Sequence, residues 1–262
     1  MRRAQPPPVR TKGAHSRRAS PRVLAVAAGV IVLAAVGIAL AVALGGGNKS
    51  SVGPLPTNGS LRNALPGAAE VRGLLRGIPQ HGFVLGSSSA RVTLTEYVDP
   101  QCPYCRELET QVMPDIVRRY VRPGKVKISA RVLDFIGPDS SRGRNALIAA
   151  AAQNKAFDLA QLLYDNQGTE NTGWLDDTMV ADAARSIPGL NPRELFATRN
   201  SAAVKAQAAA FDRDAAADGV TGTPTLFVAA PGMPRHEVSL ASPTDEHSLV
   251  AAIEAALRSP AT

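Results

Sequence analysis

Cys102 and Cys105 are the only two cysteines in the 262-residue chain, and they are separated by Pro103 and Tyr104. A disulfide between them would close a loop so short that chain entropy contributes only about 2 kcal/mol of stability, which is little for a structural cross-link. Two thiols at this spacing are better suited to switching between dithiol and disulfide. The first then attacks a partner and the second resolves the mixed disulfide. The spacing therefore predicts a redox site.

Half of a zinc site is the alternative interpretation of the cysteine pair. Such a site needs two further ligands, and the chain holds no other cysteine. The histidines lack the paired spacing of zinc ligands; they are His15, His81, His236 and His247. We therefore expect no metal, and no cofactor other than a redox-active Cys102–Cys105 disulfide.

The neighbouring elements give the two cysteines different surroundings. Residues 91–99 alternate like a strand, and residues 106–120 read as a helix. A thiolate at Cys102, where the strand ends and the helix begins, faces unpaired backbone N–H groups and the positive end of the helix dipole. Pro103 fits the first helical turn. Cys105, one turn further, is expected to be shielded and able to attack a mixed disulfide at Cys102.

Glu96 is the second residue that could do chemistry. Alternation along the strand places it on the same face as the apolar residues Val92, Leu94 and Val98. A buried carboxyl group needs a reason, and proton transfer to and from Cys105 during exchange is one. An edge position with the carboxylate in water is the alternative. Asp99 lies on the opposite face near the turn, where we expect it to act as a cap.

The remaining pattern predicts an α/β layered domain. Its further elements are a strand at 125–135, a helical block at 141–218, strands at 225–229 and 237–240, and a closing helix at about 242–257. The helical block would be a large insertion between the strands.

Residues 23–44 contain no charged or strongly polar side chain. As a helix they would run about 33 Å, enough to cross a bilayer core. Seven cations precede this segment, which predicts a cytoplasmic basic tail at 1–22 and a domain outside the cytoplasm. A cleaved signal peptide, with a motif at Ala41-Val42-Ala43, is the alternative. We expect a flexible linker at 45–77 and one domain at 78–260.

The net charge of +7 does not indicate a nucleic-acid-binding domain. Residues 1–69 hold nine of the 29 basic side chains and no acidic one, so the rest of the chain carries 20 basic and 22 acidic residues. The basic character belongs to the tail and anchor. We therefore expect no binding to DNA or RNA.

Three motifs in this order resemble one family. Glu96, Cys102-Pro-Tyr-Cys105 and Gly222-Thr-Pro-Thr225 are together similar to the DsbA-type, thioredoxin-fold disulfide oxidoreductases of bacterial envelopes. Two further segments strengthen the resemblance, Val92-Thr-Leu-Thr-Glu-Tyr-Val-Asp99 and Tyr164-Asp-Asn-Gln167. The resemblance covers about residues 78–258.

The resemblance implies roles for individual residues. Cys102 would be the nucleophile, Cys105 the resolving thiol and Glu96 the buried acid. A cis peptide between Thr223 and Pro224 would pack against the active-site disulfide. Substrate contacts would come from Pro103, Tyr104, Thr223 and Pro224.

One position departs from the strongest oxidants of that family, which carry His where this chain has Tyr104. The Pro-Tyr pair is similar to that of glutaredoxins instead. A tyrosine cannot carry the positive charge that would further stabilise the thiolate.

Together these features predict a membrane-anchored, extracytoplasmic thiol:disulfide oxidoreductase that oxidises the dithiols of exported proteins. We expect a monomer, re-oxidised by a quinone-linked membrane protein of the DsbB or vitamin-K-epoxide-reductase type. A reductase or isomerase in the same compartment is one alternative. A non-enzymatic binding module for unfolded exported chains is another.

Overall fold

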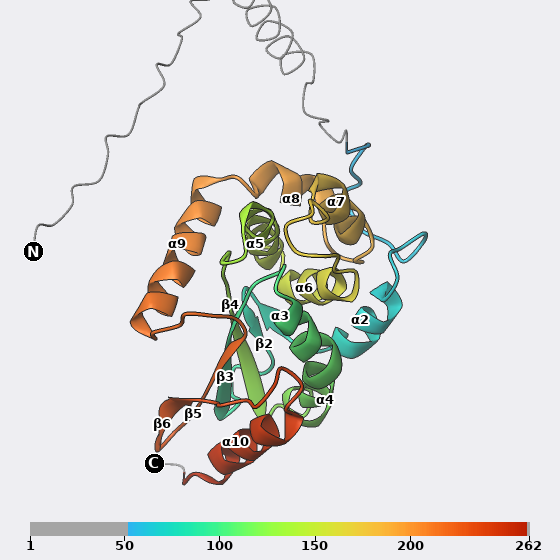
Figure 1. Ribbon diagram of the computed structural model, residues 1–262. Coiled ribbons are helices and arrows are strands. Elements are labelled where there is room, and N and C mark those ends of the chain that lie inside the picture. Colours follow the sequence, from blue (N-terminus) through green and yellow to red (C-terminus); the bar gives the residue numbers. More distant parts are fainter. Residues whose placement is uncertain (1–51, 261–262) are drawn as a thin grey trace, which may run out of the picture. The chain divides into compact units, whose positions relative to one another are not determined.

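The computed structural model describes residues 52–260 (Figure 1). The predicted tail at 1–22 and anchor at 23–44 lie outside the described residues. Within 52–260, no helix is long and apolar enough to cross a membrane. The strands are β1 (Gln80–His81), β2 (Val84–Leu85), β3 (Val92–Val98), β4 (Val126–Val132), β5 (Thr225–Ala230) and β6 (Met233–Glu237). The α-helices are α2 (Ala68–Leu75), α3 (Pro103–Glu107), α4 (Met113–Ile116), α5 (Pro138–Ala151), α6 (Ala156–Asp165), α7 (Asp177–Arg185), α8 (Pro192–Thr198), α9 (Ala202–Ala217) and α10 (Glu246–Arg258).

The strands form one sheet in the order β1-β2-β4-β3-β5-β6. Only β3 and β4 are parallel, and the other neighbours pair antiparallel. The carboxyl ends of β3 and β4 therefore meet at one edge of the sheet, where ligands and reactive groups of α/β folds commonly lie. The register of β5 against β3 pairs Thr225 with Tyr97, so the segment before β5 reaches the same edge.

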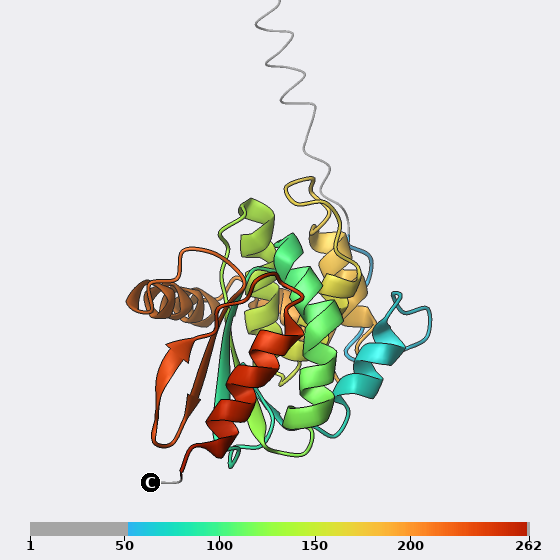
Figure 2. The ribbon, with the colours of Figure 1, turned by 60° about the horizontal axis from the view of Figure 1, so that its bottom comes forward.

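Alternation along the strands decides which helices cover which face. On β4, Ile128, Ala130 and Val132 are buried beneath α6 and the helix that follows the cysteines. Arg131 points to the other face, where it forms an ion pair with Asp214 of α9. Helix α10 lies beside α4, on the same face of the sheet as α6 (Figure 2). The sheet is thus the middle layer of an α/β/α domain, and the predicted α/β layered class is confirmed.

The helix predicted at 106–120 begins earlier, at Pro103, and runs to Val121 with two widened turns. The π-helical turns η1 (Leu108–Val112) and η2 (Val117–Val121) flank α4. Pro114 has no N–H and cannot bond to the carbonyl one turn back, so the ladder widens ahead of it. The disturbance at this proline therefore takes the form of a π-helical turn.

The helical insertion is confirmed as α5 to α9, with one long interruption. Residues 166–176 form a loop between α6 and α7, whereas the sequence pattern predicts helix there. Asn171 and Gly173 there have φ values of 56° and 79°, which a right-handed helix does not allow. The caps of α7, α8 and α9 are the side chains of Asp176, Asn191 and Ser201.

The prediction of a flexible linker over 45–77 is wrong for its last part. Residues 68–75 form α2, whose side chains Ala68, Val71 and Leu75 are buried in the core. Their i, i+3, i+7 spacing is that of an amphipathic helix, which begins directly after the Gly- and Pro-rich residues. The chain ahead of α2 is also attached, because the Gly59 N–H donates to the Leu190 carbonyl at 2.8 Å.

The second strand of the predicted hairpin is also shifted. It was expected at 237–240, but β6 spans Met233–Glu237. Gly232, with φ 74°, makes a tight reversal that lets pairing resume at once, between Ala230 and Met233.

Candidate active site

Cys102 caps the amino end of the helix that begins at Pro103. Its backbone is extended, with φ −67° and ψ 120°, while its carbonyl already accepts from the Arg106 N–H at 3.1 Å. The residue is 3 % exposed. Pro103 occupies the first helical position, where its missing N–H leaves no bond unmade. The predicted strand-to-helix junction is confirmed.

The Cys102 sulfur lies in an environment that favours its ionised form. A hydrogen bond from the Cys105 thiol is the largest influence, and the Thr223 side chain and the N–H groups of Tyr104 and Cys105 add to it. Against the opposing effect of burial, these groups lower the Cys102 pKa from 9.0 to about 6. At pH 7 such a thiol is mostly thiolate, which is the nucleophilic form.

Cys105 lies in the opposite environment. It is fully buried, and the Asp99 N–H is 3.5 Å from its sulfur. Burial raises its pKa well above 9.0, and the hydrogen bond to Cys102 and the charge there raise it further. The pair therefore holds one readily ionised thiol at the surface side and one protonated thiol beneath it.

The segment before β5 brings Thr223 and Pro224 to the cysteines. The Thr223–Pro224 peptide is cis, as the resemblance implied. The Cys102 thiol donates to the Thr223 carbonyl at 3.2 Å. Asp218 anchors this segment, because its carboxylate accepts from Arg235 at 2.5 Å and from the Tyr97 hydroxyl.

Asp99 is buried and its carboxylate binds N–H and hydroxyl groups of the active-site turn (residues 99–102) and of the segments packed against it. One carboxylate oxygen accepts from the Gln101 N–H at 2.8 Å and from the Ser140 hydroxyl at 2.7 Å. The other accepts from the Ile136 N–H at 3.0 Å. Burial raises the Asp99 pKa, against the lowering effect of these donors. The predicted capping role is confirmed in the sense that Asp99 caps the turn and the loop after β4.

Glu96 is buried, as alternation predicted; it is 3 % exposed. Burial raises its pKa from 4.5 to about 8, and a hydrogen bond with Glu109 moderates the rise. On β4, the residue paired with Glu96 is Ala130, so this neighbour supplies no cation. The alternative of an edge carboxylate in water is therefore wrong.

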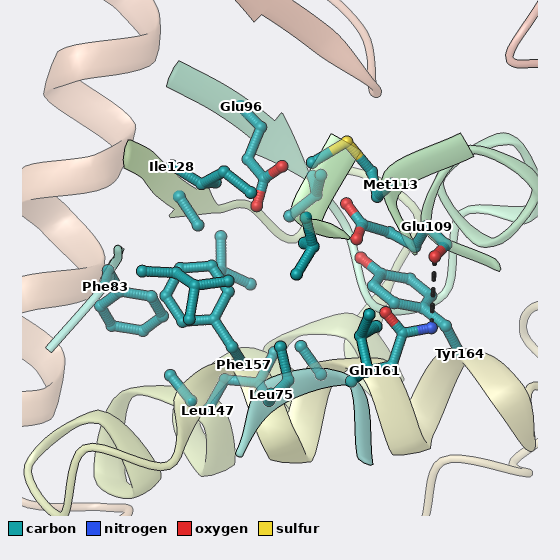
Figure 3. Close-up of a pocket in the computed structure, with 18 residues that line it drawn as sticks. Leu75, Phe83, Glu96, Glu109, Met113, Ile128, Leu147, Phe157, Gln161 and Tyr164 are labelled. Carbon is teal, nitrogen blue, oxygen red and sulfur yellow. Dashed lines mark hydrogen bonds between the residues drawn. The ribbon is translucent and has the colours of Figure 1, made fainter. Parts of the chain in front are cut away.

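Glu109 of η1 is the functional candidate that the sequence analysis missed. Its side chain and that of Glu96 line one internal cavity of about 40 Å³ beneath the sheet (Figure 3). Glu96 Oε2 and Glu109 Oε1 are both buried without a hydrogen-bond partner among the described residues. Burial and the charge of Glu96 raise the Glu109 pKa well above 4.5. The cavity is large enough for a water molecule between such oxygens.

Tyr164 of α6 connects this cavity to the cysteines. Its buried hydroxyl donates to the Asp99 carbonyl at 3.2 Å, and its ring lines the cavity (Figure 3). After burial, the charges of Cys105, Glu109, Asp99 and Glu96 raise its pKa, in that order. The Tyr164 hydroxyl is therefore neutral, and its pKa is affected by Cys105 and by the buried carboxyl groups of Asp99, Glu96 and Glu109.

The outer side of the site is apolar. Tyr104 is 58 % exposed beside Cys102, and Pro103 is exposed as well. Phe135, which the sequence analysis did not single out, is 49 % exposed in the loop after β4. That loop is held to the active-site turn through Ile136 and Asp99. Tyr104 and Phe135 are the large apolar side chains exposed within residues 52–260. Tyr104 precedes Cys105 in the chain, and Phe135 precedes Ile136, the residue that binds Asp99.

Comparison with known proteins agrees with this geometry. The family model described as thioredoxin matches residues 80–239. The chain belongs to the thioredoxin family. The match spans the sheet, the cysteine pair, the insertion and the Thr223–Pro224 peptide.

Individual relatives place it near the DsbA-type branch of that family. The chain is 27 % identical over 147 residues to a probable disulfide bond formation protein D of Bacillus cereus, covering 55 % of this chain and 68 % of the relative. The crystal structure of oxidised BdbD from Bacillus subtilis superposes with a TM-score of 0.60 at 21 % identity, over 69 % of this chain and 97 % of that one. Pseudomonas aeruginosa DsbA2 gives 0.53 at 24 % identity, over 68 % and 96 %. This thioredoxin-family chain is a thiol:disulfide oxidoreductase.

Proposed function

We propose that the chain oxidises pairs of thiols in exported proteins through a Cys102–Cys105 disulfide. The observation that carries the proposal is the opposite environment of the two thiols. The Cys102 pKa is lowered to about 6 and the Cys105 pKa is raised, so Cys102 is the better leaving group and nucleophile. Stabilising the Cys102 thiolate stabilises the dithiol form, which makes the disulfide form oxidising.

The reaction takes two exchange steps. A substrate thiolate attacks the Cys102 sulfur, the Cys102–Cys105 bond breaks, and Cys105 leaves with the electron pair and takes up a proton. A second substrate thiolate then attacks the substrate sulfur of the mixed disulfide and releases Cys102 as thiolate. The substrate has lost two electrons and gained a disulfide, and the chain has become the dithiol.

We assign the proton that Cys105 takes up to the buried carboxyl groups. Glu96 and Glu109 lie beneath the pair, and their raised pKa values leave a proton available near neutral pH. Tyr164 lines the cavity with both carboxyl groups and donates to the carbonyl of Asp99, whose N–H meets the Cys105 sulfur. We assign substrate binding to Pro103, Tyr104, Thr223 and Pro224, with Phe135 extending the apolar surface. Re-oxidation then requires an electron acceptor, for which a quinone-linked membrane protein of the DsbB or vitamin-K-epoxide-reductase type is our proposal.

The direction of electron flow is tested by the reduction potential. We expect the full chain to equilibrate with glutathione at roughly −120 to −270 mV, between DsbA and thioredoxin, because Tyr104 adds no positive charge. Tyr104→His is expected to raise the potential, since an imidazolium stabilises the thiolate. Tyr104→Phe is the matched control and should leave it unchanged. A potential at or below about −270 mV would identify a reductase of exported proteins instead.

The proposed location rests on the sequence before the domain. The apolar run at 23–44 and the seven cations ahead of it favour a retained anchor with the domain outside the cytoplasm. We expect the full-length chain in the membrane fraction, with its domain digested by protease added from outside. Recovery of a soluble chain that begins near Leu44 would instead establish a cleaved signal peptide.

A further inference from the structure

The loop between α6 and α7 contacts the whole active-site turn. Besides Tyr164, which donates to the Asp99 carbonyl, the Gln167 side chain donates to the carbonyls of Pro100, at 3.0 Å, and Cys102, at 3.2 Å. The N–H of Asn171 donates to the side-chain oxygen of Gln101 at 3.0 Å. Each residue from 99 to 102 thus accepts a hydrogen bond from one short segment of the insertion.

Packing keeps Gln167 in this position. Its N–H donates to the Tyr164 carbonyl at 3.2 Å, which continues the end of α6 into the loop. A Cβ at Gly168 would lie 2.8 Å from the Cβ and Cγ atoms of Trp174, so glycine lets the indole pack directly on the backbone beside Gln167. On the opposite side of the turn, a Cβ at Gly143 of α5 would lie 2.8 Å from the Pro100 ring. The turn is therefore held between α5 and the loop.

We propose that Gln167 is a positioning residue for Cys102, through which the helical insertion sets the acidity of the nucleophile. This rests on the proposed function, in which Cys102 is the attacking and leaving group. The Cys102 thiolate is stabilised by N–H groups of the first helical turn, and their aim depends on the orientation of the Cys102 peptide. Gln167 fixes that orientation by binding the Cys102 carbonyl from outside the helix.

The Pro100 carbonyl depends on Gln167 for its hydrogen bond. Residue 100 is buried, and among residues 52–260 the Gln167 amide is the donor that its carbonyl meets. A buried carbonyl left without a donor is costly, so the turn would have to rearrange if the amide were removed. Cys102 lies two residues away and would move with it.

Gln167→Met tests the proposal, because methionine keeps the length of the side chain and removes both donated hydrogen bonds. The matched control is Asn166→Leu. The Asn166 amide also donates to two carbonyls, those of Pro66 and Leu162, both at 2.9 Å and both outside the active-site turn. Each variant is made in the full chain, and the Cys102 pKa is measured from thiolate absorbance and from the pH dependence of alkylation.

We expect Gln167→Met to raise the Cys102 pKa by roughly half to one unit, a three- to tenfold shift toward the thiol. The reduction potential should fall by roughly 15 to 30 mV, the same shift in the two-electron couple. Asn166→Leu should lose stability but keep both values. Equal Cys102 pKa and potential in the two variants would overturn the proposal. If Gln167→Met does not fold, Tyr164→Phe removes the donor to the Asp99 carbonyl and keeps the ring, and the same comparison applies.

The outcome is separable from that of the proposed function. A parent chain whose Cys102 has an ordinary pKa, or whose potential is at or below about −270 mV, would contradict the proposed oxidase. A parent chain with an acidic Cys102 that Gln167→Met leaves unchanged would contradict only the role of Gln167.

Discussion

Cys102→Ser is expected to reduce the oxidation of a dithiol peptide to the uncatalysed rate. Cys105→Ser, which can form no internal disulfide, is expected to accumulate as a mixed disulfide when it is given a disulfide-bonded peptide, whose disulfide the Cys102 thiolate attacks and whose other sulfur leaves as a thiolate. With its pKa lowered to about 6, Cys102 is about nine-tenths thiolate at pH 7, and an ordinary thiol is only a few per cent ionised. Cys105 cannot replace it, because it is fully buried and burial raises its pKa. The two single variants should therefore fail at different steps.

The measurement follows peptide oxidation and the mass of the protein after reaction. Alkylation of the reduced parent chain should be half-maximal near pH 6 at Cys102, while Cys105 stays unmodified well above pH 9. Asn166→Leu serves as the control for general effects on folding. Full activity of Cys102→Ser toward unfolded exported chains would instead favour the non-enzymatic binding module.

The local part of this site could be predicted from the sequence because it depends on neighbours along the chain. Alternation on β3 predicted that Glu96 is buried, and the junction of strand and helix predicted the position of Cys102. Glu109 could have been found in the same way. It follows Cys105 by four residues and so shares its face of the helix.

The contacts made by the insertion could not be predicted in this way. Gln167 reaches the Cys102 carbonyl across 65 positions of sequence, and the loop that carries it was assigned to helix. The loop after β4 reaches Asp99 through the Ile136 N–H because β3 and β4 are parallel neighbours, which is a property of the topology. Such contacts depend on tertiary packing, and the periodicity of a single segment gives no information about them.

Glu96→Gln is expected to slow exchange and, at the same time, to stabilise the protein at alkaline pH. The slowing follows from the loss of a proton carrier for Cys105, since a positioned acid or base typically contributes about a hundredfold or more to rate. Glutamine keeps the shape of the side chain and can bond to Glu109, so the fold should be retained. Stopped-flow measurement of mixed-disulfide formation from pH 5 to 9 would show the loss as a changed pH profile.

Glu96→Gln should slow exchange but increase stability. Stability increases because burial raises the Glu96 pKa from 4.5 to about 8, so the ionised carboxylate destabilises the folded chain. Between these values the folded chain keeps a proton that the unfolded chain releases, so the free energy of unfolding falls as pH rises through this window. The charge of Glu109 opposes ionisation of Glu96 further, and the facing residues Ala130 and Gln161 supply no cation. Removing the ionisable group should therefore flatten the slope and stabilise the chain at pH 8 by a few kcal/mol.

Denaturant unfolding of the oxidised chain at pH 5 and pH 8 measures this effect. In the disulfide form neither cysteine titrates, so the slope reports the carboxyl groups. Glu109→Gln should change the slope in the same direction, and Glu194→Gln, which replaces an exposed carboxylate, should leave it as in the parent.

In the reduced chain, Cys102 makes a second contribution to the pH dependence of stability, and its sign is opposite to that of Glu96. The lowered Cys102 pKa stabilises the folded dithiol increasingly from about pH 6 to 9. Glu96 should therefore raise the exchange rate and lower stability at alkaline pH. Both effects are expected of a buried carboxyl group that carries the proton for Cys105. If Glu96→Gln left both the pH profile and the stability slope unchanged, the assignment of Glu96 as that carrier would be wrong.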